Sequence, residues 1–504
     1  MTRARALMLQ GTSSDAGKSV LTAALCRILR RRGFKVAPFK SQNMALNSYV
    51  TLDGKEIGRA QGVQAEACGI AATTDMNPIL LKPTGHMTSQ IIVHGRPYQD
   101  MSAIQYRSDF LPQAESIVKE ALERLRQSYD VVVLEGAGSP AEVNLKDRDI
   151  VNMRLAAWAD APVILVADID RGGVFASIVG TLEILSPPER KRVKGIIINK
   201  FRGDPAILEP GIDWLKQRTK KPVIGVIPYM EDLGIEDEDS ASLEAKIAKN
   251  RFMRHPEPEK LDIAAIRFPR IANFTDLDPF LREEDVRLRF VSGAKEWGDP
   301  DAVILPGSKN TAEDFMFMRE RGLDIKIIEH AQKGKAVVGI CGGYQMLGVK
   351  VSDPRRLESD YAEIDGFGLL PVETVFVEEK KTVRVQGFTD LYARKIPVEG
   401  YEIHMGRTRF IKPVRHLFTL DGRGEGAVSE SGNIWGTYLH GLFHNDILRT
   451  EWLNSIRRQK GWKERKTVTR YQSFRDAAFD RLADTVERHL DVERILQWLK
   501  GDSL

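Results

Sequence analysis

Residues 11–20 read Gly-Thr-Ser-Ser-Asp-Ala-Gly-Lys-Ser-Val, and this stretch decides the fold of the first half of the chain. An apolar run at 6–9 precedes it and an amphipathic segment follows, which predicts a buried strand, a tight loop and a helix. Small residues let backbone N–H groups close around phosphate oxygens, and the helix N-terminus adds a positive dipole. The stretch therefore predicts a P-loop that binds a nucleoside triphosphate.

The expected nucleotide contacts fall at both ends of this loop. Lys18 would meet the outer phosphates, and the Ser19 hydroxyl would supply an oxygen ligand to Mg²⁺. Thr12 stands where the standard P-loop has its first glycine, so the loop is one residue longer and resembles that of dethiobiotin synthetase. The alternative is a chance Gly-Lys-Ser sequence, which the flanking strand and helix disfavour. The residues of this loop expected to contact ATP are Gly11, Thr12, Gly17, Lys18 and Ser19.

Further short apolar runs alternate with helical patterns over the first two hundred residues. They lie at 36–39, 131–134, 162–167, 195–199 and 223–227. Strands that alternate with helices predict a mostly parallel sheet covered on both faces. The expected fold class is α/β, with a doubly wound P-loop domain over residues 1–230.

Polar residues follow several of these strands, at the sheet edge where such folds bind ligands. Glu135 would bind Mg²⁺ together with Ser19, because hard cations prefer oxygen ligands. The alternative is a surface glutamate beside a glycine turn, which the P-loop in the same sheet disfavours. Asn199 is expected either to contact the nucleotide or the acidic substrate, or to form an ordinary strand-end turn.

A dense polar segment, 40–44, follows the strand at 36–39. Lys40 could neutralise a phosphate or a substrate carboxylate, and Gln42 and Asn43 are further candidates for substrate binding. Weaker candidates stand at another strand end, namely Asp168, Asp170 and Arg171.

The composition changes between residues 231 and 260, where an acidic stretch and a proline-rich charged stretch indicate a linker. A second α/β pattern begins with the apolar run at 261–266 and continues at 302–305 and 336–340. We expect a second domain over 261–448. From 449 to 504 the pattern is helical and charged, and is expected to form a tail packed on the second domain.

The run at 337–340 leads directly into Cys341-Gly-Gly-Tyr-Gln-Met-Leu-Gly348. A strand, a small-residue turn bearing cysteine and then a helix predict a nucleophile elbow. The helix N-terminus favours the thiolate form of such a sulfur. The alternative is a buried structural cysteine, the usual fate of a free cysteine, and we assign Cys26 and Cys68 to it because both lie inside helical patterns.

A cysteine nucleophile needs a distant histidine to accept the thiol proton. His440 follows a strand and precedes glycine, which makes it the preferred partner; His444 and His404 are competitors. An attacked amide passes through an oxyanion that requires N–H donors. Candidate donors lie at Gly343 and in the loop 306–311, chiefly at Gly307 and Ser308.

Charge and cysteine content exclude several other classes of protein. Lysine plus arginine number 74 against 70 acids, a balance that argues against a nucleic-acid partner. Three cysteines do not make a disulfide framework, and no apolar stretch is long enough for a signal-peptide core or a membrane span. We therefore expect a cytoplasmic protein with small-molecule substrates and no membrane partner; its oligomeric state is left open.

Taken together, the motifs resemble those of the cobyric acid synthase family over nearly the whole chain. They lie at 38–44, 56–61, 76–83, 135–139, 198–204, 269–276, 306–311, 341–348 and 436–443. The resemblance implies a dethiobiotin-synthetase-like domain followed by a class I-type glutamine amidotransferase domain. It further implies that ATP, with Mg²⁺, and glutamine serve to amidate the b, d, e and g carboxylates of adenosylcobyrinic acid a,c-diamide.

One position departs from the wider amidotransferase pattern. Many class I enzymes have a glutamate two residues after the histidine, where this chain has Leu442. A Cys341–His440 dyad is therefore the expectation, and Glu402 is our guess for the group that orients His440.

Three other functions are weighed. Cobyrinic acid a,c-diamide synthase shares the architecture, but its motif should differ from residues 40–44. A P-loop partitioning or maturation ATPase would need neither Cys341 nor His440, and usually has lysine where this chain has Thr12. An inactive scaffold is disfavoured by intact candidate residues at both sites.

Overall fold

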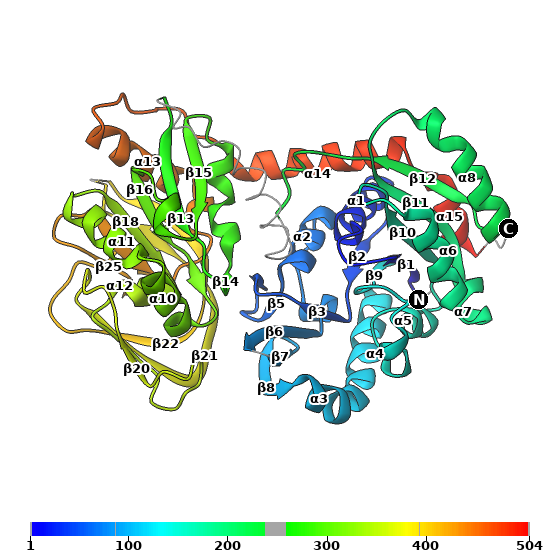
Figure 1. Cartoon of the computed structure of the whole chain (residues 1–504), viewed down its shortest axis with the longest axis horizontal. Helices are drawn as coiled ribbons and strands as arrows, with labels where there is room; N and C mark the ends of the chain where they lie inside the picture. The colour runs from blue at the N-terminus through cyan, green and yellow to red at the C-terminus, as the bar shows by residue number, and fades with distance from the viewer. Residues whose placement is uncertain (1–2, 86, 237–258, 393, 502–504) are drawn as a thin grey trace. The chain divides into compact units, whose positions relative to one another are not determined.

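The computed structural model describes residues 3–85, 87–236, 259–392 and 394–501, which form two compact units (Figure 1). Unit 1 comprises Met1–Ala45, Glu56–Ile235 and Ser473–Leu504, and unit 2 comprises Leu46–Lys55 and Glu236–Gln472. Most of the linker expected at 231–260 lies outside the described residues.

Unit 1 is built on a parallel sheet with the strand order β12–β11–β10–β1–β9–β2. These strands are β12 (Val223–Pro228), β11 (Val193–Phe201), β10 (Val163–Asp168), β1 (Arg5–Gly11), β9 (Val131–Glu135) and β2 (Val36–Phe39). Each expected strand is present, and the structure moves some of their ends by one or two residues. Almost every residue of β1, β9 and β10 is buried, because helices cover both faces of the sheet.

The helices of unit 1 follow the strands as the doubly wound expectation requires, so the fold class is confirmed. They include α1 (Lys18–Arg31), α2 (Arg59–Cys68), α4 (Leu111–Ser128), α5 (Met153–Ala159), α6 (Val174–Ile184), α7 (Pro187–Arg192) and α8 (Pro205–Thr219). Leu21 and Leu25 of α1 pack against Leu7 of β1 and Val133 of β9 in one core.

A smaller sheet carries the polar segment 40–44 within unit 1. Its order is β3–β6–β7–β8, with β3 parallel to β6 and the other neighbours antiparallel. The strands are β3 (Gln42–Met44), β6 (Ile79–Gly85), β7 (Thr88–Val93) and β8 (Arg96–Ser102).

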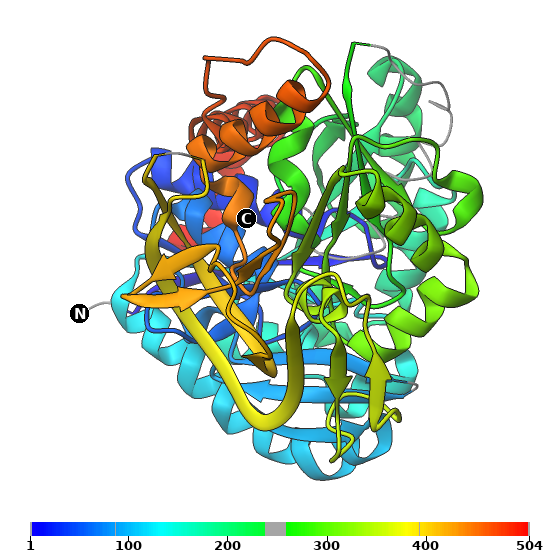
Figure 2. The same ribbon diagram turned by 90° about the vertical axis from the view of Figure 1, so that its left-hand side faces the viewer.

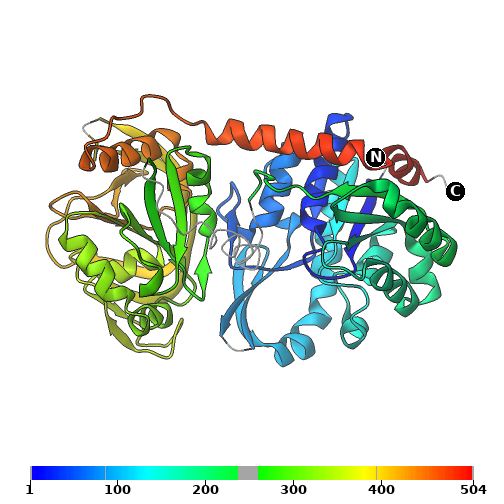
Figure 3. The ribbon, with the colours of Figure 1, turned by 45° about the horizontal axis from the view of Figure 1, so that its top comes forward.

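The C-terminal segment corrects one expectation. Helix α13 (Asp446–Gln459) does pack in unit 2, where Trp452 is fully buried. Most of α14 (Tyr471–Arg488) and all of α15 (Val492–Lys500) instead belong to unit 1 (Figure 3). The Phe479 and Ile495 side chains are part of the hydrophobic core of that unit. Helical periodicity identifies a buried face, but it does not reveal which core that face covers.

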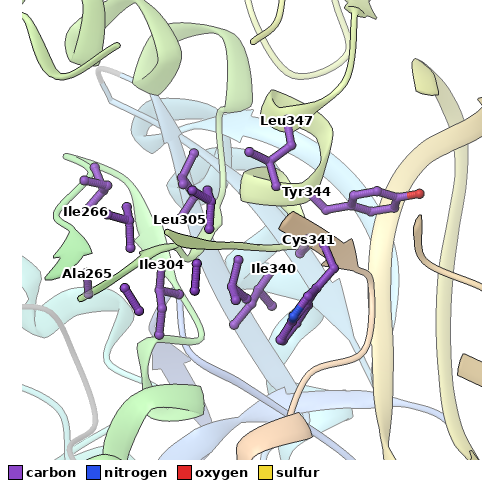
Figure 4. Packing of buried hydrophobic residues seen from close by; sticks show 14 of the residues in the cluster. Ala265, Ile266, Ile304, Leu305, Ile340, Cys341, Tyr344 and Leu347 are labelled. Atoms are coloured by element: carbon purple, nitrogen blue, oxygen red, sulfur yellow. The ribbon is translucent and has the colours of Figure 1, made fainter. Parts of the chain in front are cut away.

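Unit 2 contains a second mainly parallel sheet with the order β15–β13–β16–β18–β26–β25, in which only the last pair is antiparallel. The strands are β15 (Val286–Val291), β13 (Leu261–Ile266), β16 (Ala302–Leu305), β18 (Ala336–Ile340), β26 (Ile434–Thr437) and β25 (Ala427–Val428). The covering helices include α10 (Thr311–Glu320), α11 (Leu323–Gln332) and α12 (Gly342–Leu347). Figure 4 shows Ile304, Leu305 and Ile340 side by side in the core, with Cys341 at the end of β18.

A long antiparallel pair, β21 (Val372–Thr389) and β22 (Ile396–Phe410), forms a further sheet in unit 2 (Figure 2). The apolar runs considered above did not predict this pair. Across the described part of the chain, no helix has both the length and the apolar character needed to cross a membrane.

Candidate active sites

The P-loop of unit 1 lies between β1 and α1, as expected. Gly17 precedes the helix with φ +95°, a left-handed conformation that suits glycine. A side chain there would also strike Asn199, whose Nδ2 lies 2.1 Å from the position of an added Cβ. The Lys18 Nζ donates to the carbonyl oxygens of Ser13 and Gly138, at 3.0 Å each. Two backbone carbonyl oxygens, one in the P-loop and one at Gly138, therefore fix the position of the Lys18 ammonium group.

The Glu135 carboxylate accepts hydrogen bonds from several polar side chains of unit 1, and we call this cluster the Glu135 junction. Glu135 Oε1 accepts hydrogen bonds from the Ser19 hydroxyl at 2.8 Å and from Lys40 Nζ at 2.9 Å. Its Oε2 accepts from Gln64 Nε2 at 2.6 Å. The Glu135 and Lys40 side chains are almost completely buried, so this is a desolvated ion pair beside the P-loop.

The donor set at this junction fits Mg²⁺. Ser19 and Glu135 offer one hydroxyl and one carboxylate, the sparse protein ligation that Mg²⁺ accepts when phosphate oxygens and water supply the remainder. Within the described residues no group of three or more His, Cys, Asp or Glu side chains forms a protein-only metal cage. The pattern therefore matches a metal that binds together with a nucleotide.

The other predicted residues of unit 1 form hydrogen bonds with neighbours in the same unit. Asn199 Nδ2 donates to the carbonyl oxygen of Ala16, inside the P-loop, at 2.9 Å. Asn43 Nδ2 donates to Gln61 Oε1 at 3.0 Å, and Gln42 Oε1 accepts from the Tyr106 hydroxyl.

The weaker candidates at the end of β10 are held in ion pairs, and the Asp168 side chain is buried. Asp168 lies 2.8 Å from Lys200 Nζ, Asp170 lies 2.8 Å from Arg202, and Arg171 contacts a P-loop aspartate at 3.1 Å.

Cys341 of unit 2 forms a sharp turn between β18 and α12. Its φ of +51° and ψ of −107° are strained for a residue with a Cβ, and such strain is typical of functional turns. The backbone can turn here because Gly343 packs directly on β16, where an added Cβ would lie 2.0 Å from the Leu305 carbonyl oxygen. The geometry is that of the nucleophile elbow expected from the sequence. Cys26 and Cys68 are buried in α1 and α2, as expected.

His440 is fully buried, and Cys341 is one of the two neighbours that raise its pKa; the Cys341 Sγ itself donates to the Ile403 carbonyl oxygen at 3.7 Å. Its Nδ1 is 2.7 Å from Asp276 Oδ2, while Asp276 Oδ1 accepts the Gly441 N–H at 2.7 Å. Because Asp276 occupies Nδ1, Nε2 is the nitrogen available to the sulfur. Burial lowers the pKa of His440, but Asp276 and Cys341 outweigh burial and raise this pKa to about 10.

Asp276 corrects the guess that Glu402 orients His440. Glu402 instead pairs with Lys381 and lies 3.3 Å from His404 Nε2, and neither contact reaches His440. Asp276 sits on a short 3-10 helix, Phe274–Arg282, inside the motif 269–276 that carried part of the resemblance. No spacing rule links an aspartate to a histidine 164 residues away, so only the fold reveals the pair.

The competing histidines have other contacts. His444 Nε2 lies 3.1 Å from the Thr275 carbonyl oxygen, and the His404 ring stacks on Tyr438 with 3.7 Å between centroids.

A second polar contact on His440 comes from Asn273, whose Nδ2 lies 3.5 Å from Nε2 and whose Oδ1 accepts the Ser48 N–H.

The predicted oxyanion donors are only partly suited to that task. The Gly343 N–H already donates to the Pro306 carbonyl oxygen at 3.1 Å. Gly307 and Ser308 do lie at the site: a Cβ added to Gly307 would be 3.4 Å from His440 Cε1, and one added to Gly342 would be 2.9 Å from Ser308 N. The loop 306–311 therefore supplies the better-placed backbone N–H.

Comparison with protein families agrees with both sites. Residues 7–243 match the CobQ/CobB/MinD/ParA nucleotide binding domain, and residues 262–447 match the CobB/CobQ-like glutamine amidotransferase domain. The two folds define a glutamine-dependent amide ligase that uses ATP. A cobyric acid synthase of Geobacillus thermodenitrificans is 53% identical over 501 residues, which is 99% of each chain. The chain belongs to the cobyric acid synthase family, whose members carry out amidation in cobalamin biosynthesis.

Other relatives are equally similar along their length. The cobyric acid synthase of Geobacillus kaustophilus is 53% identical, covering 99% of this chain and 98% of its own. That of Desulforamulus reducens is 52% identical, covering 99% of both chains.

Proposed function

We propose that the chain converts adenosylcobyrinic acid a,c-diamide to adenosylcobyric acid by amidating its b, d, e and g carboxylates. Unit 2 hydrolyses glutamine to glutamate and ammonia, and unit 1 uses ATP and that ammonia to form each amide. The observation that carries the proposal is the presence of a complete Cys341–His440–Asp276 site and a P-loop with Glu135 in one chain of this family.

In the glutaminase half-reaction Cys341 is the nucleophile. His440 holds the proton of the thiol before the attack, so that Cys341 reacts as the thiolate, and later gives a proton to the departing ammonia, while Asp276 holds the ring in the required orientation. A protonated His440 beside the sulfur favours the reactive thiolate. The Ser308 N–H is the preferred oxyanion donor, with Gly307 beside it. Water then releases glutamate from the thioester.

In the synthetase half-reaction the γ-phosphate of ATP activates a substrate carboxylate as an acyl phosphate. Lys18 and the P-loop backbone from Gly11 to Gly17, with Thr12 among them, hold the phosphates, and Asn199 supports the loop. Ser19 and Glu135 would hold Mg²⁺, which supplies charge neutralisation at the phosphate oxygens when it is bound. Lys40, Gln42 and Asn43 are proposed to face the carboxylate that reacts. The cytoplasmic location and the small-molecule partners named here remain predictions.

Two alternatives compete with this proposal. Cobyrinic acid a,c-diamide synthase would amidate the a and c carboxylates, and the similarity to proteins named cobyric acid synthase disfavours it. An ATPase switch would not require a glutaminase site, so the presence of Cys341 and His440 disfavours this alternative.

Mass spectrometry of the corrinoid product tests the substrate assignment. Wild-type enzyme would be incubated with ATP, Mg²⁺, glutamine and either cobyrinic acid or adenosylcobyrinic acid a,c-diamide. We expect four successive replacements of a hydroxyl by an amino group on the diamide. Amidation of cobyrinic acid at two positions only would favour the first alternative, and ATP hydrolysis without any amide would favour the second.

A further inference from the structure

Two buried glutamines on α2, one of which contacts Glu135, present amide atoms that no described residue satisfies. Gln61 and Gln64 are 0% and 1% exposed and lie three residues apart, so they occupy the same face of the helix. The unpaired atoms are Gln61 Nε2, a donor, and Gln64 Oε1, an acceptor. Buried polar groups without partners are rare in folded proteins, and such a pair calls for an occupant.

Neighbouring groups fix the orientation of both amides. The Glu135 carboxylate only accepts hydrogen bonds, so Gln64 must present its NH₂ group there and turn Oε1 away. Asn43 Oδ1 accepts the Met44 N–H, so Asn43 presents its NH₂ group to Gln61 Oε1 and leaves Gln61 Nε2 unpaired. The two buried, unpaired atoms are therefore one N–H donor on Gln61 and one carbonyl acceptor on Gln64, the residue that contacts Glu135.

A donor and an acceptor on one face of α2 match the two atoms that change when an acyl phosphate becomes an amide. The acyl oxygen gains negative charge and requires a donor, whereas the attacking nitrogen carries N–H groups and requires an acceptor. A carboxylate or phosphate oxygen would be repelled by Gln64 Oε1. The site is also closed to bulk water, and ammonia is no larger than a water molecule.

We propose that Gln61 and Gln64 form the ammonia end of the synthetase site. This inference rests on the proposed function. Gln64 Oε1 accepts an N–H bond from ammonia and leaves its lone pair directed at the acyl carbon. Gln61 Nε2 donates to the acyl oxygen as charge develops there.

The chemical step balances with the reactants already named. The nitrogen lone pair forms the new C–N bond, and the carbonyl electron pair moves onto oxygen and returns as the C–O bond to phosphate breaks. Phosphate leaves as HPO₄²⁻ with one of the three ammonia protons, and the product retains two as the primary amide.

The test measures amide and ADP formation by the full-length enzyme against ammonium chloride concentration, with saturating ATP and adenosylcobyrinic acid a,c-diamide. Gln64→Met removes the acceptor, and we expect the KM for ammonia to rise about tenfold or more, with more ADP released per amide. Gln61→Met removes the donor and should lower kcat about a hundredfold with little change in that KM.

Gln64→Glu separates ammonia binding from support of Glu135. It keeps an acceptor oxygen but places a second carboxylate against Glu135 and perturbs its charge, so the KM for ATP should rise while the KM for ammonia stays within about twofold of wild type. Thr181→Val, an isosteric loss of a buried polar group on α6, serves as the matched control and should change neither constant.

Either of two results would overturn the inference. One is an unchanged KM for ammonia in Gln64→Met, with an unchanged ratio of ADP to amide. The other is an increase in the KM for ATP alone in the same variant, which would mean that Gln64 only positions Glu135. If wild-type enzyme makes no amide from ammonia, it is the proposed function that fails.

Discussion

The His440 Nδ1 and Asp276 Oδ2 atoms lie 2.7 Å apart in the buried centre of unit 2. The same carboxylate also accepts the Gly441 N–H, so one aspartate fixes both the imidazole ring and the turn that follows it. A Cys–His pair in this fold therefore has a third member from a distant part of the chain. This relationship makes His440 a strongly basic imidazole, with a pKa raised to about 10 after the opposing effect of burial.

Replacing Asp276 with asparagine should strongly reduce glutamine hydrolysis. The loss of the carboxylate frees the ring and allows the wrong tautomer, so we expect kcat to fall about 10²–10⁴-fold. Amidation supported by free ammonia should continue. Glutamate release measures the first effect, and Glu402→Gln is the comparison: a larger loss in that variant than in Asp276→Asn would contradict the assignment.

The same pair should make stability depend on pH in a definite direction. The folded-state pKa of His440, about 10, exceeds the ordinary value of 6.5, so the folded protein binds this proton more tightly than the unfolded chain does. The stabilisation is complete below the ordinary pKa and is lost as the pH rises through the folded-state pKa. Urea unfolding of wild type and Asp276→Asn should show a difference in unfolding free energy that shrinks across this window. A difference independent of pH would argue against the pair.

Glu135→Gln should damage both stability and ATP-dependent amidation. The change would break the buried ion pair between Glu135 and Lys40, and removing one partner of such a pair typically costs about 3–5 kcal/mol. Addition of Lys40→Met to this variant should recover part of the stability but none of the amidation. Denaturant unfolding and ammonia-supported amide synthesis measure the two effects; equal losses of stability in the single and double variants would show that the ion pair is not the cause.

Gly343→Ala should destabilise unit 2, because the added Cβ would lie 2.0 Å from a backbone oxygen that cannot move away. We expect a loss of about 1–3 kcal/mol or more in the free energy of unfolding. Gly293→Ala is the matched control, since an added Cβ there meets nothing within 4 Å. Equal stability of the two variants would contradict the close packing of α12 on β16.

The sequence predicts those features that short-range patterns determine. The apolar runs locate every strand of the first parallel sheet and the strands β13, β16 and β18 of the second, and the small-residue turns locate Lys18 and Cys341, because each strand–turn–helix unit is local. Ser19 and Glu135 were both predicted as Mg²⁺ ligands, and the structure brings them into direct contact, since both stand at the carboxyl edge of one sheet.

Features that depend on long-range packing escaped prediction. Asp276 is distant from His440 in sequence, and its motif contains several other polar residues. Gln64 sits in a helix whose spacing indicates only burial, and its contact with Glu135 appears when α2 folds over the sheet. Whether α14 and α15 pack in unit 1 or in unit 2 depends on which hydrophobic core has a complementary surface, and here it is the core of unit 1.

The most direct test of the two-unit account compares Cys341→Ala and Lys18→Met in the amidation of adenosylcobyrinic acid a,c-diamide, with glutamine or with ammonia as nitrogen source. Mass spectrometry follows the corrinoid, and a glutamate assay follows the first half-reaction. We predict that Cys341→Ala makes no amide from glutamine but makes it from ammonia, whereas Lys18→Met makes none from either source and still folds. Amide formation from glutamine by folded Cys341→Ala, or from ammonia by Lys18→Met at the wild-type rate, would contradict the division of chemistry between the two units.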